Sequence, residues 1–394
     1  MLTNLVLPEL IESSDRSLRQ FACSFSATSF DKNSFSFLAD LKLREWTANA
    51  ASRVLCCVPF EPDSWNWITE NVPQSHVDAY WTTCRGFVRE GRSSELEQAI
   101  ETLLQYRRAF SAADMLEMAM RWYKCDAELA YKVLEAGLSR SDNDESVESI
   151  DAYATQELIK YLQQQSTDQL PRLARIEWGY LSLLDPYGSE VVPETLLSEL
   201  QRNPSLFVDL LKLVYRGRSE PPREEPLDGS EQFQWRHAQE LLDVFEQLPG
   251  YSEDGSVDSD TLLAWIVEAR RLAVEVDRIE ITDLQIGKLL SHCQQVDGES
   301  WPPDAVCFGL ETVGTDDILE GFTNGLISGR GVTSRSPFAG GDQERTLAAK
   351  YREVAERCQA NYPRLASALR GLAEHYDQYA EHEDEEAERR KLER

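Results

Sequence analysis

The chain has 394 residues, of which 42% are hydrophobic, and it carries 69 acidic against 40 basic side chains, for a formal net charge of −29. This hydrophobic content excludes a disordered chain, and the length suffices for two or three folded domains. The negative charge disfavours binding to nucleic acids and to anionic membrane surfaces, because both repel an acidic protein.

The N-terminal stretch MLTNLVLPELIESSDRS lacks the basic region and the long apolar core of a signal peptide. The longest apolar run, Val54 to Phe60, is much shorter than the ~20 residues that a membrane-spanning helix needs. We therefore expect a cytoplasmic protein with no membrane association.

The eight cysteines are scattered, mostly within apolar helical patterns, and no C-x-x-C spacing occurs. This usage is typical of a reducing compartment, and we expect free, buried thiols. His292 adjoins Cys293, but the sequence has no H-E-x-x-H or paired-ligand spacing, so we expect no metal site. The cysteines are Cys23, Cys56, Cys57, Cys84, Cys125, Cys293, Cys307 and Cys358.

An aromatic cluster lies within FEPDSWNWITENVPQSHVDAYW, at 60–81. Trp65 and Trp67 are two positions apart, so on one helix they cannot both face the same core stripe. One of them is therefore a candidate interface anchor, since exposed tryptophans dominate many interfaces. The alternative, which we favour, is that both serve packing within the fold.

Helical periodicity dominates the rest of the chain, and we find no convincing strand alternation. We therefore expect an all-α protein, an irregular α-solenoid or stacked array of helical hairpins. Two polar segments, 139–151 and 216–231, have the composition of linkers. They predict three helical blocks, at 1–140, 141–216 and 231–394. The apolar stripes include Leu206, Leu210, Leu211 and Val214; Leu262, Trp265, Ile266, Ala269 and Leu272; and Ile286, Leu289, Leu290 and Cys293.

The sequence also predicts which residues cap some of the helices. Asp258 or Asp260 is expected to cap the helix that follows, and Thr282 and Asp283 are candidate caps of the next one. After Pro363 the chain predicts a second helix of a C-terminal hairpin, with a charged end from Glu381. We expect that end to be a solvated, fraying helix.

Known functional motifs do not fit. GLISGRGVTSR, at 325–335, has neither the spacing nor the lysine of a phosphate-binding loop, so we expect no nucleotide cofactor. SEDGSVDSD, at 252–260, lacks the first carboxylate and the last glutamate of a calcium loop. ITDLQIGKLLSHC, at 281–293, is followed by an acidic, proline-broken segment and not by a recognition helix, so DNA binding is not expected.

The glycine-rich stretch RGVTSRSPFAGGDQER precedes a predicted helix and raises two alternatives. Arg330 and Arg335, together with open amides at the helix start, suit an anionic ligand. The same arginines equally suit ion pairs with the protein's own carboxylates, which is the interpretation we favour. In either case we expect both arginines at the surface, where their replacement costs little stability.

Several stretches resemble the C-terminal region of a group of large, poorly characterised bacterial proteins, over residue 75 to the end. Similar long proteins often join an NTPase or effector module to a helical sensor region, sometimes in antiphage defence. The resemblance implies partner or ligand sensing and no chemistry for this helical part. The stretches are ARIEWGYLSLLD, LQRNPSLFVDLLKLVYR, DGSVDSDTLLAWIVEARRLA, ITDLQIGKLLSH, DGESWPPDAV and RGVTSRSPFAGGDQERTLAAKYR.

These observations lead to a functional prediction: a non-enzymatic helical scaffold or sensor that binds a protein partner, in a bacterial defence or stress system. The alternative is a nucleotide- or anion-binding protein, or an enzyme, with an unfamiliar helical site near Arg330 and Arg335. The sequence identifies neither the partner nor the oligomeric state.

Overall fold

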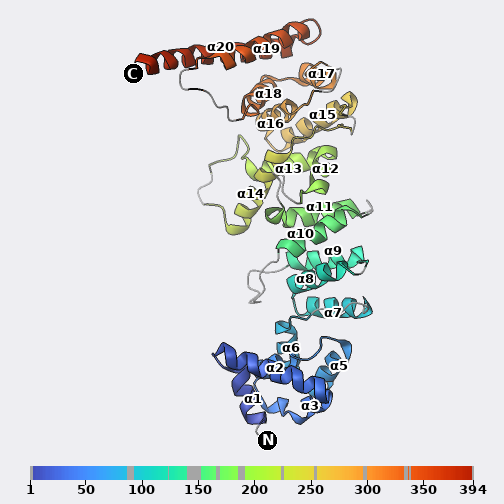
Figure 1. Cartoon of the computed structure of the whole chain (residues 1–394). Helices are drawn as coiled ribbons and strands as arrows, with labels where there is room; N and C mark the ends of the chain where they lie inside the picture. Colours follow the sequence, from blue (N-terminus) through green and yellow to red (C-terminus); the bar gives the residue numbers. More distant parts are fainter. Residues whose placement is uncertain are drawn as a thin grey trace. The chain divides into compact units, whose positions relative to one another are not determined.

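A computed structural model describes residues 3–86, 93–122, 124–139, 152–165, 169–184, 191–222, 226–252, 255–295, 300–331, 336 and 339–392. Within these ranges the chain forms twenty α-helices and no strand, which confirms the predicted all-α class (Figure 1). The finer prediction of an irregular α-solenoid stays a prediction. Among the helices that the structure describes, none combines the length and hydropathy needed to cross a membrane.

The helices form two compact units, Met1–Leu184 and Asp185–Arg394. The first contains α1 (Thr3–Glu12), α2 (Arg16–Asn33), α3 (Phe35–Asp40), α4 (Ala48–Leu55), α5 (Pro62–Asn71), α6 (Gln74–Thr83), α7 (Ser93–Gln105), α8 (Ala109–Met120), α9 (Ala127–Leu138), α10 (Ala152–Gln163) and α11 (Leu170–Gly179). The second contains α12 (Glu194–Arg202), α13 (Pro204–Val214), α14 (Gly229–Val244), α15 (Ser259–Glu275), α16 (Ile279–Ser291), α17 (Asp304–Val313), α18 (Asp316–Ser328), α19 (Asp342–Cys358) and α20 (Pro363–Leu392).

This division differs from the three predicted blocks, 1–140, 141–216 and 231–394, because helices pack across both expected linkers. In the first unit α10 packs against α8 and α9, on the other side of the acidic segment, whose residues 140–151 lie outside the described ranges. In the second unit α13 packs against α14 and α15. Polar composition thus marks connections within a unit, and the division falls after Leu184.

The corner between α1 and α2 is built from polar contacts. The Asp15 carboxylate caps α2 by accepting from the backbone N–H of Ser17 at 2.7 Å. The Arg19 guanidinium donates to the carbonyls of Ser13 at 2.6 Å and Ser14 at 2.9 Å, which lie just beyond the end of α1. These bonds hold α2 in a defined direction beside α1 and α4, which also contact each other.

In the second unit, α16 and α18 cross at unusually close range because glycines face each other's backbone. A Cβ atom at Gly287 would lie 2.1 Å from the carbonyl oxygen of Ile318. A Cβ atom at Gly321 would lie 2.1 Å from the carbonyl oxygen of Leu284. Neither position has room for a side chain, so glycine is required at this crossing.

The predicted caps of the helices in this unit are partly wrong. Asp258 caps α15, as one of the two expected candidates, with its carboxylate 2.8 Å from the N–H of Thr261. Thr282 and Asp283, however, lie inside α16 and are buried. The Asp283 carboxylate accepts two bonds from Arg270 and one from the Thr315 hydroxyl, so it joins three helices and does not cap one.

The C-terminal hairpin is present as α19 and α20, which pack along each other and bury Tyr351 and Tyr376 as a stacked pair. The first turn of α20 is capped from a distance: the Glu311 carboxylate of α17 accepts from the N–H groups of Arg364 at 2.9 Å and Leu365 at 3.4 Å. The charged end remains helical to Leu392.

Candidate binding groove

One face of α2 lines two adjoining depressions in the first unit. Arg16, Gln20, Cys23 and Asp31 recur at helical spacing, so they lie along one side of the helix. The depressions have volumes of about 700 Å³ and 280 Å³ and share Cys56 and Cys57, at the turn that ends α4. We call them together the α2 groove. Helix α2 lines the larger depression from Arg16 to Cys23 and the smaller one at Asp31.

The larger depression is basic. It is lined by Arg16, Arg19 and Arg53, and no acidic residue is among the described residues that line it. Arg53 is held by bonds to the Ile11 carbonyl at 3.2 Å and to the Asn49 side chain at 3.3 Å. Each guanidinium has five N–H donors, more than these contacts use. The depression therefore offers fixed positive charge and spare donors within a chain of net charge −29.

Arg16 differs from the other two arginines. Its side chain is exposed, and within the part of the chain that the structure describes it makes no hydrogen bond or ion pair. A free cation at the mouth of the depression is available to an incoming ligand without breaking any contact of the fold.

The centre of the groove is lined by thiols. All eight cysteines are free and five are buried, as predicted, but Cys56 is exposed and Cys23 and Cys57 are half-buried. Although the Cys56 residue as a whole is exposed, the atoms packed around its thiol exclude water from the charged form and raise its pKa to about 11. Burial likewise raises the pKa of Cys57 and, to about 12, that of Cys84. These thiols are neutral near pH 7 and act as small apolar surfaces.

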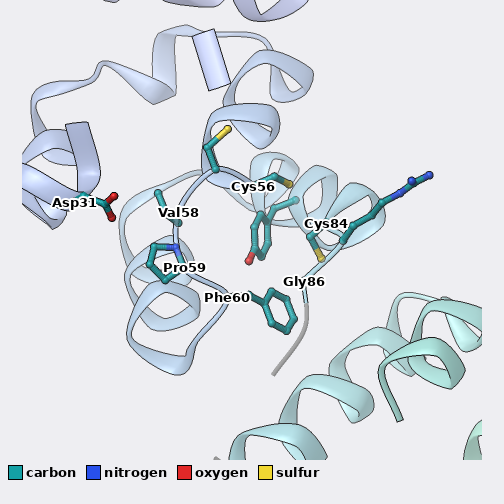
Figure 2. A pocket seen from close by; sticks show the side chains of 10 residues that line it. Asp31, Cys56, Val58, Pro59, Phe60, Cys84 and Gly86 are labelled. Carbon is teal, nitrogen blue, oxygen red and sulfur yellow. The ribbon is translucent and has the colours of Figure 1, made fainter. Parts of the chain in front are cut away.

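The smaller depression is mixed in character, since Asp31 and Arg85 line it together with apolar side chains. Val58, Pro59 and Phe60 form one side, and Figure 2 shows them between Asp31 and the pair Cys84 and Gly86. The Phe60 ring packs on buried Trp65, with ring centroids 4.8 Å apart. Gly86 is needed here, because a Cβ atom would lie 2.0 Å from the Phe60 ring. The groove therefore carries arginines at both depressions, with neutral thiols between them.

The two candidate tryptophans have different environments. Trp65 is 3% exposed and belongs to the core, where it also contacts Trp81 at 5.7 Å between ring centroids. Trp67 is half-buried and stacks on Phe35 at 6.1 Å between ring centroids. Trp65 is thus no surface anchor itself, although it supports the groove by holding Phe60.

The two candidate arginines of the glycine-rich loop lie elsewhere, in the second unit. Arg330 donates to the Glu344 carboxylate of α19 at 2.7 Å, and the exposed fractions of the two side chains are 17% and 0%. Arg330 thus pairs with one of the protein's own carboxylates, as favoured above, but its side chain is only partly exposed, because Glu344 is buried at the start of the hairpin. Arg335 lies outside the described residues.

Sequence reasoning missed the α2 groove. The signal on α2 itself was present, as Arg16, Arg19 and Cys23 at helical spacing in an acidic chain. The opposite wall comes from α4 and from Thr83 on α6, and no pattern along the chain brings these elements together.

The groove thiols should react slowly with electrophiles. We expect iodoacetamide to alkylate Cys56 at pH 8 about tenfold or more slowly in the folded protein than in the denatured chain, where thiols ionise near pH 8.5. Because a raised pKa lowers the thiolate fraction, the rate should increase as the pH approaches 11. Mass spectrometry of the Cys56 peptide checks this. Rapid alkylation near pH 7 would instead indicate an activated thiol.

Comparison with protein-family models, curated proteins and solved structures finds no match for this chain. Across the described residues, no group of three or more histidine, cysteine and acidic side chains is arranged to hold a metal ion. Over the residues that it describes, the structure thus defines an all-helical protein of two units, with the α2 groove on the first.

Proposed function

We propose that this chain is a non-enzymatic helical module that binds a protein partner through the α2 groove. The observation that carries this proposal is the pair of adjoining depressions, whose lining combines arginines, neutral thiols and the ring of Phe60. A small anion would need only the three arginines of the larger depression, whereas a protein surface can match charged, neutral and apolar groups together.

The chemistry of the groove supports binding over catalysis. A nucleophilic cysteine needs a lowered pKa or an adjacent base, but the pKa values of Cys56, Cys57 and Cys84 are raised by burial. A role in a bacterial defence or stress system is part of this proposal and rests on the sequence resemblance alone. The alternative of an anion site at Arg330 loses support, because that guanidinium is committed to Glu344.

The proposal is tested by affinity capture from cells that make the protein, using wild type and two matched arginine variants. Arg16→Glu reverses the free charge of the groove, whereas Arg370→Glu reverses an exposed charge on α20 in the second unit. We expect capture of a protein partner by wild type and by Arg370→Glu, and about five- to tenfold less by Arg16→Glu, since reversal replaces attraction by repulsion.

Partners that all three proteins capture equally would show that the groove is not the contact surface. Thermal stabilisation by a nucleotide that disappears in Arg16→Glu would replace the proposal by small-anion binding, because a ligand of the native state raises its stability.

A further inference from the structure

We infer that the second unit holds a site for a small aromatic carboxylate, in a depression where the end of α12, the start of α13 and the first turns of α15 meet. The depression has a volume of about 610 Å³. A cavity of about 150 Å³ already takes up benzene, so this one has room for a molecule of one or two rings. The α2 groove belongs to the first unit, and the inference does not depend on the function proposed for it.

The apolar part of the depression is an aromatic surface that is fixed in place. Trp265 on α15 is only 4% exposed, and its indole N–H donates to the Leu200 carbonyl at 3.2 Å. Its ring packs on that of Phe207, with the ring centroids 5.1 Å apart. Pro204 and Ala264 also line the depression. Such a surface suits the flat, apolar ring of a ligand, because both surfaces lose contact with water on binding.

The neutral polar groups of the lining are held in defined positions as well. Gln201 donates from its side-chain amide to the Leu248 carbonyl at 3.3 Å, which leaves its amide oxygen as an acceptor. Tyr251 is held through its backbone, by an isolated antiparallel bridge to Val257. Within the described ranges, the Tyr251 hydroxyl makes no hydrogen bond. A ligand can bond to such preformed groups at little cost in conformational entropy.

The charge of the lining determines the acidic group of the ligand. Arg202, the last residue of α12, is the one charged side chain among the described residues that line the depression. It is exposed, and in the part of the chain that the structure describes its side chain makes no hydrogen bond or ion pair. A guanidinium matches a carboxylate through two parallel N–H···O bonds.

The single cation also limits the charge of the ligand. Arg202 balances one negative charge, whereas a phosphate ester carries nearly two. The carboxylate of Asp258, which accepts from the N–H of the lining residue Thr261 at 2.8 Å, adds negative charge nearby. Because like charges repel, a monoanion is favoured over a dianion at this site.

The test is isothermal titration calorimetry of the full chain with benzoate, phenylacetate and indoleacetate, each compared with its neutral amide and all compared with phenyl phosphate. We expect at least one carboxylate to bind, and to bind tenfold or more tightly than its amide, because the amide lacks the charge-assisted bond to Arg202. Phenyl phosphate should bind more weakly than that carboxylate.

Two variants separate charge from space. Arg202→Met should lower the affinity for the carboxylate at least tenfold and leave that for the amide unchanged, since it removes only the cation. Ala264→Phe fills the depression from the exposed side of α15 and should abolish the binding of both compounds. Arg370→Met, which removes an exposed cation of α20, is the matched control and should bind as wild type does. Thermal unfolding of each variant verifies that it is folded.

The inference is overturned if no carboxylate of the panel binds, or if acid and amide bind equally well. Binding that Arg202→Met and Ala264→Phe leave unchanged would place the ligand elsewhere and overturn it too, as would a preference for phenyl phosphate. None of these outcomes bears on partner capture through Arg16, so the proposed function is tested separately.

Discussion

Gly321→Ala is expected to lower the free energy of unfolding of the second unit by about 2–3 kcal/mol, as overpacking at a site without free space does. The new Cβ atom would lie 2.1 Å from the carbonyl oxygen of Leu284 and 2.8 Å from its carbonyl carbon. These are backbone atoms of α16, so no side chain can rotate away and the two helices must separate. Gly287→Ala should behave in the same way, since its Cβ atom would meet the backbone of α18.

Whether the alanine raises or lowers the stability distinguishes a glycine at a close helix crossing from an ordinary glycine within a helix. An alanine within a helix is normally more stable than a glycine by up to about 1 kcal/mol. Gly371, in α20, is exposed, and apart from its chain neighbours and the adjoining backbone of its own helix no atom lies within 4 Å of a Cβ atom built there. Gly371→Ala is therefore the matched control and should raise the melting temperature. Thermal unfolding of the three variants checks this, and an increase for Gly321→Ala would contradict the close crossing.

Arg330→Met should cost about 3 kcal/mol, because removing one partner of a buried ion pair leaves the other charge poorly solvated. Glu344 is fully buried, and its carboxylate accepts a bond from the Arg330 guanidinium at 2.7 Å. The Cζ atom of the same guanidinium lies 5.8 Å from the centroid of the Tyr376 ring. The sequence had suggested a small effect for this arginine, of the kind expected for an exposed pair. Urea unfolding followed by circular dichroism measures the difference.

The double variant Arg330→Met/Glu344→Met separates charge from packing. It should recover much of the stability lost in Arg330→Met, since replacing both partners by apolar side chains removes the unsolvated carboxylate. A loss of less than about 1 kcal/mol in Arg330→Met alone would place this pair among exposed ones and contradict the burial described here.

Some features of this fold can be predicted from residues that are close in the sequence, whereas others depend on contacts between distant residues. Apolar stripes such as Leu206, Leu210 and Leu211 predicted α13 correctly, because the period of a helix is written along the chain. Asp283 was misassigned as a cap because its partners, Arg270 and Thr315, lie on neighbouring helices. A buried carboxylate within a helix and a capping carboxylate before one look alike until the tertiary contacts are known.

The α2 groove and the unit boundary were missed for the same reason, because both depend on contacts between elements that are far apart in the sequence. Arg16 and Arg19 were visible as helical neighbours, but only the packing of α2 beside α4, which itself packs on α6, brings them to the same depression as Arg53 and Thr83. Linker-like composition at 216–231 suggested a boundary. In the fold this region is tied to the helices after it, since Arg278 donates to Glu220 at 2.8 Å and to the Tyr215 carbonyl at 3.0 Å.

The cap that Glu311 supplies to α20 has a kinetic consequence. Forming the first turn is the costly step of helix formation, and the group that satisfies its amides lies 53 residues earlier in the chain. The longest of the described helices, α20, therefore completes the capping of its first turn only after α17 has docked against it. Its appearance during refolding should follow the slower closure of a long loop and not the microsecond rate of an isolated helix.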